Sequence, residues 1–139
     1  MTEREANGHG GAESGAVSLA DLSDLATPWC LRVVATLRIA DHIAAGTADA
    51  ADLAAATASD SDFLRRVLRH LVGKGVFEEA SPDRFALNEA ARGLLDPAQR
   101  LGLDLNAFGG RMAAAWGTLL KVVRTGQPAY HELFGLPFW

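Results

Sequence analysis

Four histidines and one cysteine are the side chains of this sequence best suited to bind a metal or attack a substrate. No two histidines have the i, i+4 spacing that places two metal ligands on one helix face; they are His9, His42, His70 and His131. Cys30 falls inside an apolar segment, where a buried thiol is usually inert. We therefore expect no metal site and no catalytic residue in this chain.

The 14 glycines do not form a cofactor-binding loop. A dinucleotide or adenosyl group is held by a Gly-x-Gly-x-x-Gly turn between a strand and a helix, and that pattern is absent from the sequence. Gly73-Lys74-Gly75 instead follows a helical segment and predicts its end. We expect no cofactor-binding residue within 1–139.

Aromatic and methionine side chains gather towards the end of the chain and could form the wall of a pocket for a planar ligand, because they supply broad apolar surfaces. Ordinary packing in a core or an interface is the alternative for each of them. The candidates for such a pocket are Phe108, Met112, Trp116 and Tyr130.

The composition limits the kind of protein that can present these side chains. A chain of 139 residues can form one ordinary globular core, and its net charge of −4 provides no overall attraction to nucleic acid. A single cysteine excludes an internal disulfide, and no apolar run reaches the roughly 20 residues that cross a membrane. The glycine-rich start lacks a secretion signal, so we expect a disordered tail over 1–17 and a cytoplasmic protein.

The first half of the chain predicts helices. Ser18 can cap a short helix over 19–25, and Thr27 can cap a long helix from Pro28 to Gly46. A short alanine-rich helix follows over 47–57. The helix over 61–72 has leucines and valines on one side and arginines on the other.

A hairpin and further helices follow. The runs 76–79 and 84–87 predict two short strands around a Ser81-Pro82-Asp83 turn, and Asn88 can cap a helix to Leu95. Residues 99–125 predict helix again, with a break at Gly109-Gly110. The predicted fold is mainly α: a winged-helix-like domain over 18–97 with a small two-stranded hairpin, and a helical extension over 98–139.

This order permits a second hypothesis, a stand-alone winged-helix regulator that binds DNA. The third helix of such a fold can enter the major groove, and Arg65, Arg66 and Arg69 are placed on that helix. However, the chain is acidic, and its hairpin carries carboxylates where a phosphate-contacting wing has basic residues. We therefore expect no nucleic acid and no membrane as partners.

Several segments, taken in order, resemble a known family: DLATPWCLRVVATLRIADHI, DLAAAT, FLRRVLRHLVGKGVFEE, FALNEAARGLL and WGTLLKVVRTGQPAYHELFGLPFW. Together they resemble the N-terminal part of bacterial small-molecule O-methyltransferases that use S-adenosylmethionine. The likeness is greatest to enzymes that tailor aromatic polyketides such as anthracyclines, and it spans about 18–139.

The resemblance implies a winged-helix-like dimerisation domain, whose helices interlock with those of a second subunit. In the family a Rossmann-like domain follows and holds S-adenosylmethionine, and we expect that domain to lie beyond Trp139. S-adenosylmethionine is thus expected for the full-length family, and no methyl transfer is expected from residues 1–139 alone.

The resemblance also suggests partners. We expect a homodimer, or pairing with a full-length subunit, with Trp29, Val33 and Leu37 as candidates for the interface. In a full-length enzyme the helix that carries Met112 and Trp116 would help to form the pocket for a small aromatic acceptor.

Overall fold

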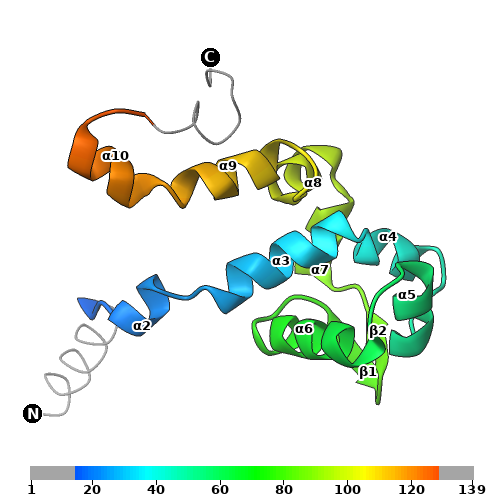
Figure 1. Cartoon of the computed structure of the whole chain (residues 1–139). Helices are drawn as coiled ribbons and strands as arrows, with labels where there is room; N and C mark the ends of the chain where they lie inside the picture. Colours follow the sequence, from blue (N-terminus) through cyan, green and yellow to red (C-terminus); the bar gives the residue numbers. More distant parts are fainter. Residues whose placement is uncertain (1–14, 129–139) are drawn as a thin grey trace, which may run out of the picture.

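The computed structural model describes residues 15–128. In this part of the chain helices predominate, and two short strands form an antiparallel hairpin, which confirms the predicted fold class. The hairpin and the helices before it form one body (Figure 1). Two arms extend from it on the same side: the first helices of the described chain form one arm and the last two form the other (Figure 1).

The first arm begins with α2 (Leu19–Leu22), and Ser18 Oγ accepts a hydrogen bond from the Asp21 N–H, as the sequence predicts. The helix ends at Leu22, so its predicted extension to Leu25 is wrong. The next helix, α3 (Ala26–Thr36), starts before Pro28. Thr27 was predicted to cap it, but the Thr27 N–H itself donates to the Asp24 carboxylate, 3.3 Å away.

The predicted long helix from Pro28 to Gly46 is wrong, because the chain breaks at Arg38 into α3 and α4 (Ile39–Ala44). Arg38 has a left-handed backbone conformation, with φ of 59°. This turn places Ile39 and Ala40 in the core, where both are buried. Gly46, with φ of 107°, follows the end of α4 as predicted.

An aspartate caps each of the next two helices, α5 (Ala50–Ala56) and α6 (Ser61–Gly73). Asp49 accepts from the Ala51 N–H at 2.9 Å, and Asp60 accepts from the Phe63 N–H at 2.9 Å. The two-sided pattern of α6 is confirmed, because its leucines are buried and Arg66 and Arg69 are exposed. The largest fully buried side chains of the described chain are Phe77, Phe85, Ile39, Leu53, Leu68, Leu71 and Val34.

The hairpin consists of β1 (Glu78–Ser81) and β2 (Arg84–Ala86), with Glu79 opposite Phe85. Its first strand starts two residues later than predicted, because Phe77 has a left-handed φ of 69°. The Asn88 side chain fixes this turn: its Oδ1 accepts from the Phe77 N–H at 3.1 Å, and its Nδ2 donates to the Gly75 carbonyl at 2.9 Å. Asn88 also caps α7 (Glu89–Arg92), as predicted, and the short 3-10 helix η1 (Gly93–Leu95) follows.

The second arm starts from α8 (Pro97–Leu103) and continues through α9 (Phe108–Trp116) and α10 (Leu119–Thr125). The predicted break at Gly109-Gly110 is wrong, because both glycines lie in the first turn of α9. They permit a close approach: a Cβ at Gly109 would overlap the Gly102 carbonyl, and one at Gly110 would overlap the Leu105 carbonyl. The helix breaks fall at 104–107 and at Gly117 instead.

Two polar contacts join this arm to the body. Arg100 NH1 lies 3.0 Å from Asp41 Oδ2, which links α8 to α4. The Leu105 N–H donates to Thr36 Oγ1 at 2.8 Å, which links the loop before α9 to the end of α3. These contacts hold the base of α9 against the body of the molecule.

Candidate functional site

The two arms carry large apolar side chains that the described chain leaves exposed. Neither α2 nor α10 has a buried residue. Trp116 is 66% exposed and Leu120 is 63% exposed, and such side chains gain about 1.5–3 kcal/mol when they are fully buried. We call this set the uncovered apolar surface; it comprises Leu19, Leu22, Leu25, Trp29, Phe108, Trp116, Leu119, Leu120 and Val123.

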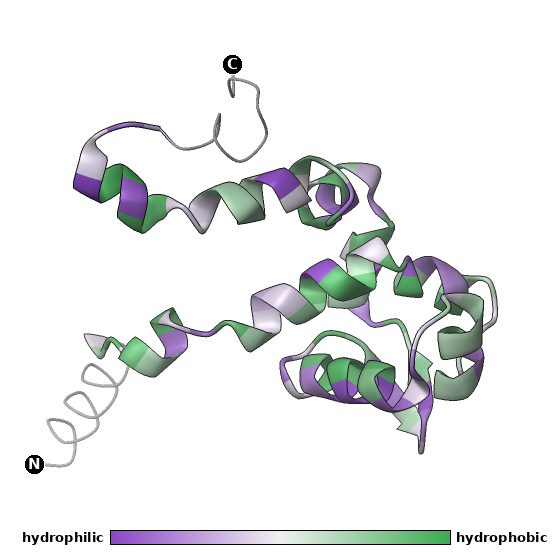
Figure 2. Cartoon of the chain, viewed as in Figure 1, coloured by the Kyte–Doolittle hydropathy of each residue, from purple (hydrophilic) through white to green (hydrophobic). Residues whose placement is uncertain are grey.

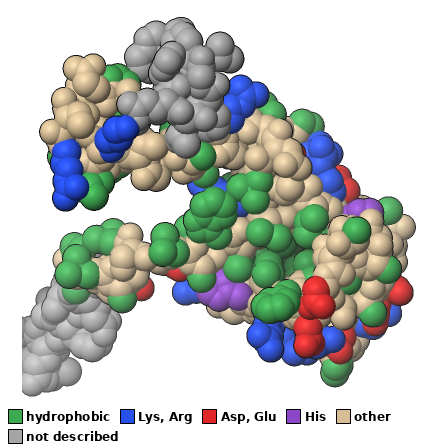
Figure 3. Space-filling view, viewed as in Figure 1, with side chains coloured by type: hydrophobic (Ala, Val, Ile, Leu, Met, Phe, Trp, Pro, Cys, Tyr) green, Lys and Arg blue, Asp and Glu red, His purple; other side chains and the backbone are tan. Residues whose placement is uncertain are grey.

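Hydrophobic residues occur along both arms, and the surface view shows apolar side chains along α2 and α3 (Figures 2 and 3). Exposed apolar patches larger than a few hundred Å² are uncommon on monomeric proteins and mark interaction surfaces. The uncovered apolar surface thus has the apolar composition of an interaction surface.

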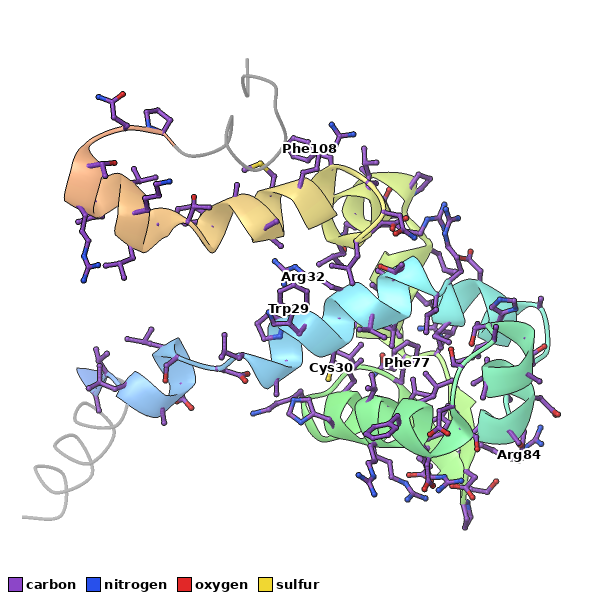
Figure 4. All side chains as sticks on the ribbon, in the orientation of Figure 1. Trp29, Cys30, Arg32, Phe77, Arg84 and Phe108 are labelled. Atoms are coloured by element: carbon purple, nitrogen blue, oxygen red, sulfur yellow. The ribbon has the colours of Figure 1, made fainter. Side chains whose placement is uncertain are left out.

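Helix α3 divides its residues between the core and this surface. Val34 and Ala35 are buried against the body, whereas Trp29 is 45% exposed. The Arg32 guanidinium lies over the Trp29 ring, 5.4 Å from its centroid, and donates to the Pro28 carbonyl at 3.1 Å. Both side chains project from the side of α3 that faces α9 (Figure 4).

The three interface candidates therefore occupy different environments. Trp29 belongs to the uncovered apolar surface, and Val33 is half-buried. Leu37 packs against the core of its own chain.

Three pocket candidates share helix α9 at successive i, i+4 positions, so they lie along one side of it. Phe108 is 53% exposed, Met112 is half-buried and Trp116 is exposed. Phe108 projects away from α3 (Figure 4), so it does not face Trp29. Tyr130 lies outside the described residues.

The arginines of α6 are engaged by carboxylates of the hairpin. Arg69 NH2 lies 3.1 Å from Glu79 Oε2 and 2.9 Å from Asp83 Oδ1. Arg65 Nε lies 3.0 Å from the same Asp83 oxygen, and Arg65 NH1 lies 2.7 Å from Asp62. The surface view shows acidic and basic side chains next to one another over this region (Figure 3). This arrangement gives no support to the DNA-binding hypothesis.

Cys30 points from α3 towards α6 (Figure 4). Burial raises the pKa of its thiol, and the Asp24 carboxylate raises it further. A raised pKa lowers the thiolate fraction at neutral pH, so Cys30 is poorly suited to act as a nucleophile. His70 Nε2 lies 2.8 Å from Thr27 Oγ1.

Within residues 15–128 there is neither a metal-binding cluster nor a membrane-spanning helix. No group of three or more His, Cys, Asp and Glu side chains there is arranged to hold a metal ion. None of the helices in the same range has the length and apolar character needed to cross a membrane.

The residues that hold α9 in place were not predicted from the sequence. The contacts of Thr36 and Arg100 join residues 59 or more positions apart in the sequence. The two glycines of α9 act through close backbone contacts. Only the adjacent Gly109-Gly110 carried a signal, and a helix break was the wrong interpretation of it.

The relatives of this chain among known proteins include methyltransferases and a hydroxylase. The chain is 42% identical over 132 residues to the 2,7-dihydroxy-5-methyl-1-naphthoate 7-O-methyltransferase of Streptomyces carzinostaticus. The matched region covers 93% of this chain and 40% of that protein. It is 43% identical over 128 residues to the aclacinomycin 10-hydroxylase RdmB of Streptomyces purpurascens, and this match covers 88% of this chain and 34% of that protein. The chain thus spans two fifths or less of the length of these two relatives.

Solved structures agree. The O-methyltransferase NcsB1 from neocarzinostatin biosynthesis, in complex with S-adenosylmethionine and 2-hydroxy-5-methyl naphthoic acid, superposes with a TM-score of 0.81 at 43% identity. That match covers 89% of this chain and 39% of NcsB1.

A family model, the O-methyltransferase dimerisation domain, matches residues 19–97. This range takes in α2 through η1, which includes the first arm and the whole winged-helix-like body. The chain therefore belongs to the O-methyltransferase dimerisation domain family.

Proposed function

We propose that this chain forms the dimerisation part, and one wall of the acceptor pocket, of an S-adenosylmethionine-dependent O-methyltransferase that acts on a small aromatic molecule. The relatives support this proposal, since one methylates a naphthoate and a related structure holds both a methyl donor and a naphthoic acid. The similarity to a hydroxylase supports the scaffold and the aromatic substrate class more strongly than the reaction itself.

The uncovered apolar surface is the observation that carries the proposal. Dimer interfaces are large and apolar, and a symmetric pair buries the same patch on both subunits. We propose a homodimer in which α2, the start of α3, and α10 pack against a second copy. Trp29 and Val33 contact the partner in this arrangement, and Leu37 contributes through its accessible edge.

The acceptor pocket is proposed to include one side of α9. Phe108, Met112 and Trp116 lie along that side, and Tyr130 is proposed to join them. The contacts at Thr36 and at the two glycines hold the base of α9, which would keep such a wall in place. The acceptor hydroxyl would then be oriented for in-line attack on the donor methyl group.

We propose that the methyl donor is bound outside these residues, by a separate domain of the enzyme. Isothermal titration calorimetry of residues 1–139 with S-adenosylmethionine should give no heat of binding. Saturable binding would show that the donor site lies within this chain. A cytoplasmic location is proposed too, supported by the single cysteine and by the bacterial biosynthetic relatives.

Sedimentation equilibrium tests the dimer. The unaltered chain should sediment as a dimer, and Leu120→Glu should weaken association at least tenfold, about 1.4 kcal/mol, because it would bury an unpaired charge. Phe63→Glu is the matched control: Phe63 is 65% exposed on α6 and is not part of the uncovered apolar surface, and Leu120 is 63% exposed on α10.

The control variant should remain a dimer. A chain that sediments as a monomer at every concentration, or a Phe63→Glu variant that dissociates as much as Leu120→Glu, would contradict the proposed interface.

A further inference from the structure

Helix α6 holds the position from which a winged-helix protein contacts DNA, and it carries three arginines, Arg65, Arg66 and Arg69. A guanidinium group binds phosphate and carboxylate in the same way, through a planar set of N–H donors. Where these donors point therefore decides whether the fold can hold a polyanion.

Two of the three guanidinium groups already bind carboxylates of the hairpin. Arg69 Nε is 3.3 Å from each Glu79 oxygen, and Arg69 NH2 is 3.1 Å from Glu79 Oε2 and 2.9 Å from Asp83 Oδ1. Asp83 Oδ1 is also 3.0 Å from Arg65 Nε. We call these four residues, Arg65, Arg69, Glu79 and Asp83, the hairpin clasp.

The carboxylates of the clasp are themselves held in place. Glu79 Oε2 accepts a 2.8 Å hydrogen bond from the Asp83 N–H, across the turn of the hairpin. The hydrogen bonds from Arg69 and from this N–H keep the pKa of Glu79 below its ordinary value, so Glu79 keeps its negative charge further into the acid range than an ordinary glutamate. Asp83 has a left-handed φ of 63°, which directs it back towards α6 at the tip of the hairpin.

The five ion-paired side chains of this region have no net positive charge to attract an anion. Arg65 and Arg69 contribute two positive charges, and Asp62, Glu79 and Asp83 contribute three negative charges, which leaves this group at −1. A DNA phosphate would have to displace carboxylates of the same chain, which lose side-chain entropy but no translational entropy when they bind the arginines. Arg66 lies outside the clasp, with its guanidinium 5.4 Å from the Phe63 ring centroid.

We infer that Glu79 and Asp83 occupy the phosphate-binding positions of the winged helix, and that these two residues keep α6 from binding duplex DNA. The fold retains the geometry of a DNA-binding element, and the hairpin clasp makes it inactive as one. This inference does not depend on methyl transfer or on the proposed dimer interface.

The test is fluorescence anisotropy with a random-sequence DNA duplex at low ionic strength. The unaltered chain should not bind, while the Glu79→Gln, Asp83→Asn double variant should, because the charge of this group of five side chains changes from −1 to +1. Arg69 loses both of its carboxylate partners, whereas Arg65 keeps its ion pair with Asp62. Three arginine contacts predict that the logarithm of affinity falls against the logarithm of salt concentration with a slope of about −2.7.

A matched control distinguishes loss of the hairpin clasp from the accompanying change in net charge. Asp52→Asn with Glu89→Gln removes two exposed carboxylates from α5 and α7, and leaves the clasp intact. This control should not bind DNA. Adding Arg65→Ala and Arg69→Ala to the clasp variant should abolish the binding gained.

Circular dichroism shows whether each variant is folded, and the single variants Glu79→Gln and Asp83→Asn serve if the double variant is not. The inference is overturned if a folded clasp variant fails to bind, if the control binds equally well, or if the unaltered chain binds DNA with the affinity of the variant. Sedimentation of the same samples reports on the dimer separately, so failure of one proposal is distinguishable from failure of the other.

Discussion

The hydroxyl of Thr36 accepts a 2.8 Å hydrogen bond from the backbone N–H of Leu105, 69 positions further along the chain. The same hydroxyl donates to the Arg32 carbonyl at 2.7 Å within α3. One small side chain at the end of α3 therefore holds the loop from which α9 starts.

Thr36→Val should destabilise the chain, because valine keeps the shape and leaves the Leu105 N–H without its partner. The expected loss is about 1–3 kcal/mol in the free energy of unfolding, measured by urea denaturation. Thr125→Val is the control: Thr125 is exposed and donates to a carbonyl of its own helix at 2.8 Å. That change should stay within about 0.5 kcal/mol, and an equal loss at both positions would contradict the role given to Thr36.

Ala58→Gly should stabilise the chain. Ala58 follows α5 with a left-handed φ of 52°. This conformation costs a residue with a Cβ about 1–2 kcal/mol. The extra conformational entropy that glycine loses on folding costs less, about 0.5–1 kcal/mol. Ala55→Gly makes the same chemical change inside α5 and should destabilise by about 1 kcal/mol. The midpoint of thermal unfolding should rise for Ala58→Gly and fall for Ala55→Gly. A shift in the same direction for both variants would contradict the left-handed conformation of Ala58.

Gly109→Ala should destabilise the chain, by about 1–3 kcal/mol, because its Cβ would overlap the Gly102 carbonyl and push α9 away from α8. Gly102→Ala provides the contrast, since a Cβ at Gly102 meets no atom within 4 Å and the residue is helical. Alanine there should add about 0.5–1 kcal/mol of stability. Stabilisation by both substitutions in urea would show that α8 and α9 are not in close contact.

Glu79 should make stability depend on pH in acid. Its pKa in the fold is lowered from 4.5, chiefly by the hydrogen bond from Arg69, so the unfolded chain binds the proton more readily. Its contribution is therefore complete above pH 4.5 and is lost as the pH falls through the lower value in the folded chain. Glu79→Gln should reduce the loss of stability on acidification, whereas Glu89→Gln, at an exposed carboxylate of α7, should not.

Equilibrium unfolding at neutral pH and below pH 4 gives the comparison. If Glu79→Gln leaves the acid dependence of the unfolding free energy unchanged, the ion pair with Arg69 does not persist in solution.

Local signals accounted for much of the fold. Helix α6 was predicted within one residue at its end, because its leucines recur at the helical period and glycines follow it. Asn88, Ser18 and Gly46 were each placed correctly, since capping depends on neighbouring residues alone.

The errors involve contacts between distant segments. Nothing near Arg38 in the sequence indicates a left-handed residue, and the break is favoured by burial of Ile39 and Ala40 against the rest of the body. Likewise, Gly109 and Gly110 are needed for the approach of other backbone segments, not for a turn of their own. Phe108 was identified from composition, but its projection away from α3, and so from Trp29, required the structure (Figure 4).

Asn88 has a consequence for how the chain opens. Its one side-chain amide caps α7 through a 2.9 Å bond from the Ala91 N–H and also binds both Gly75 and Phe77 at the entry to the hairpin. Opening of either element therefore breaks bonds that support the other. We expect the amide protons of the hairpin and of α7 to exchange with solvent as one cooperative unit, and Asn88→Ala to separate them into two.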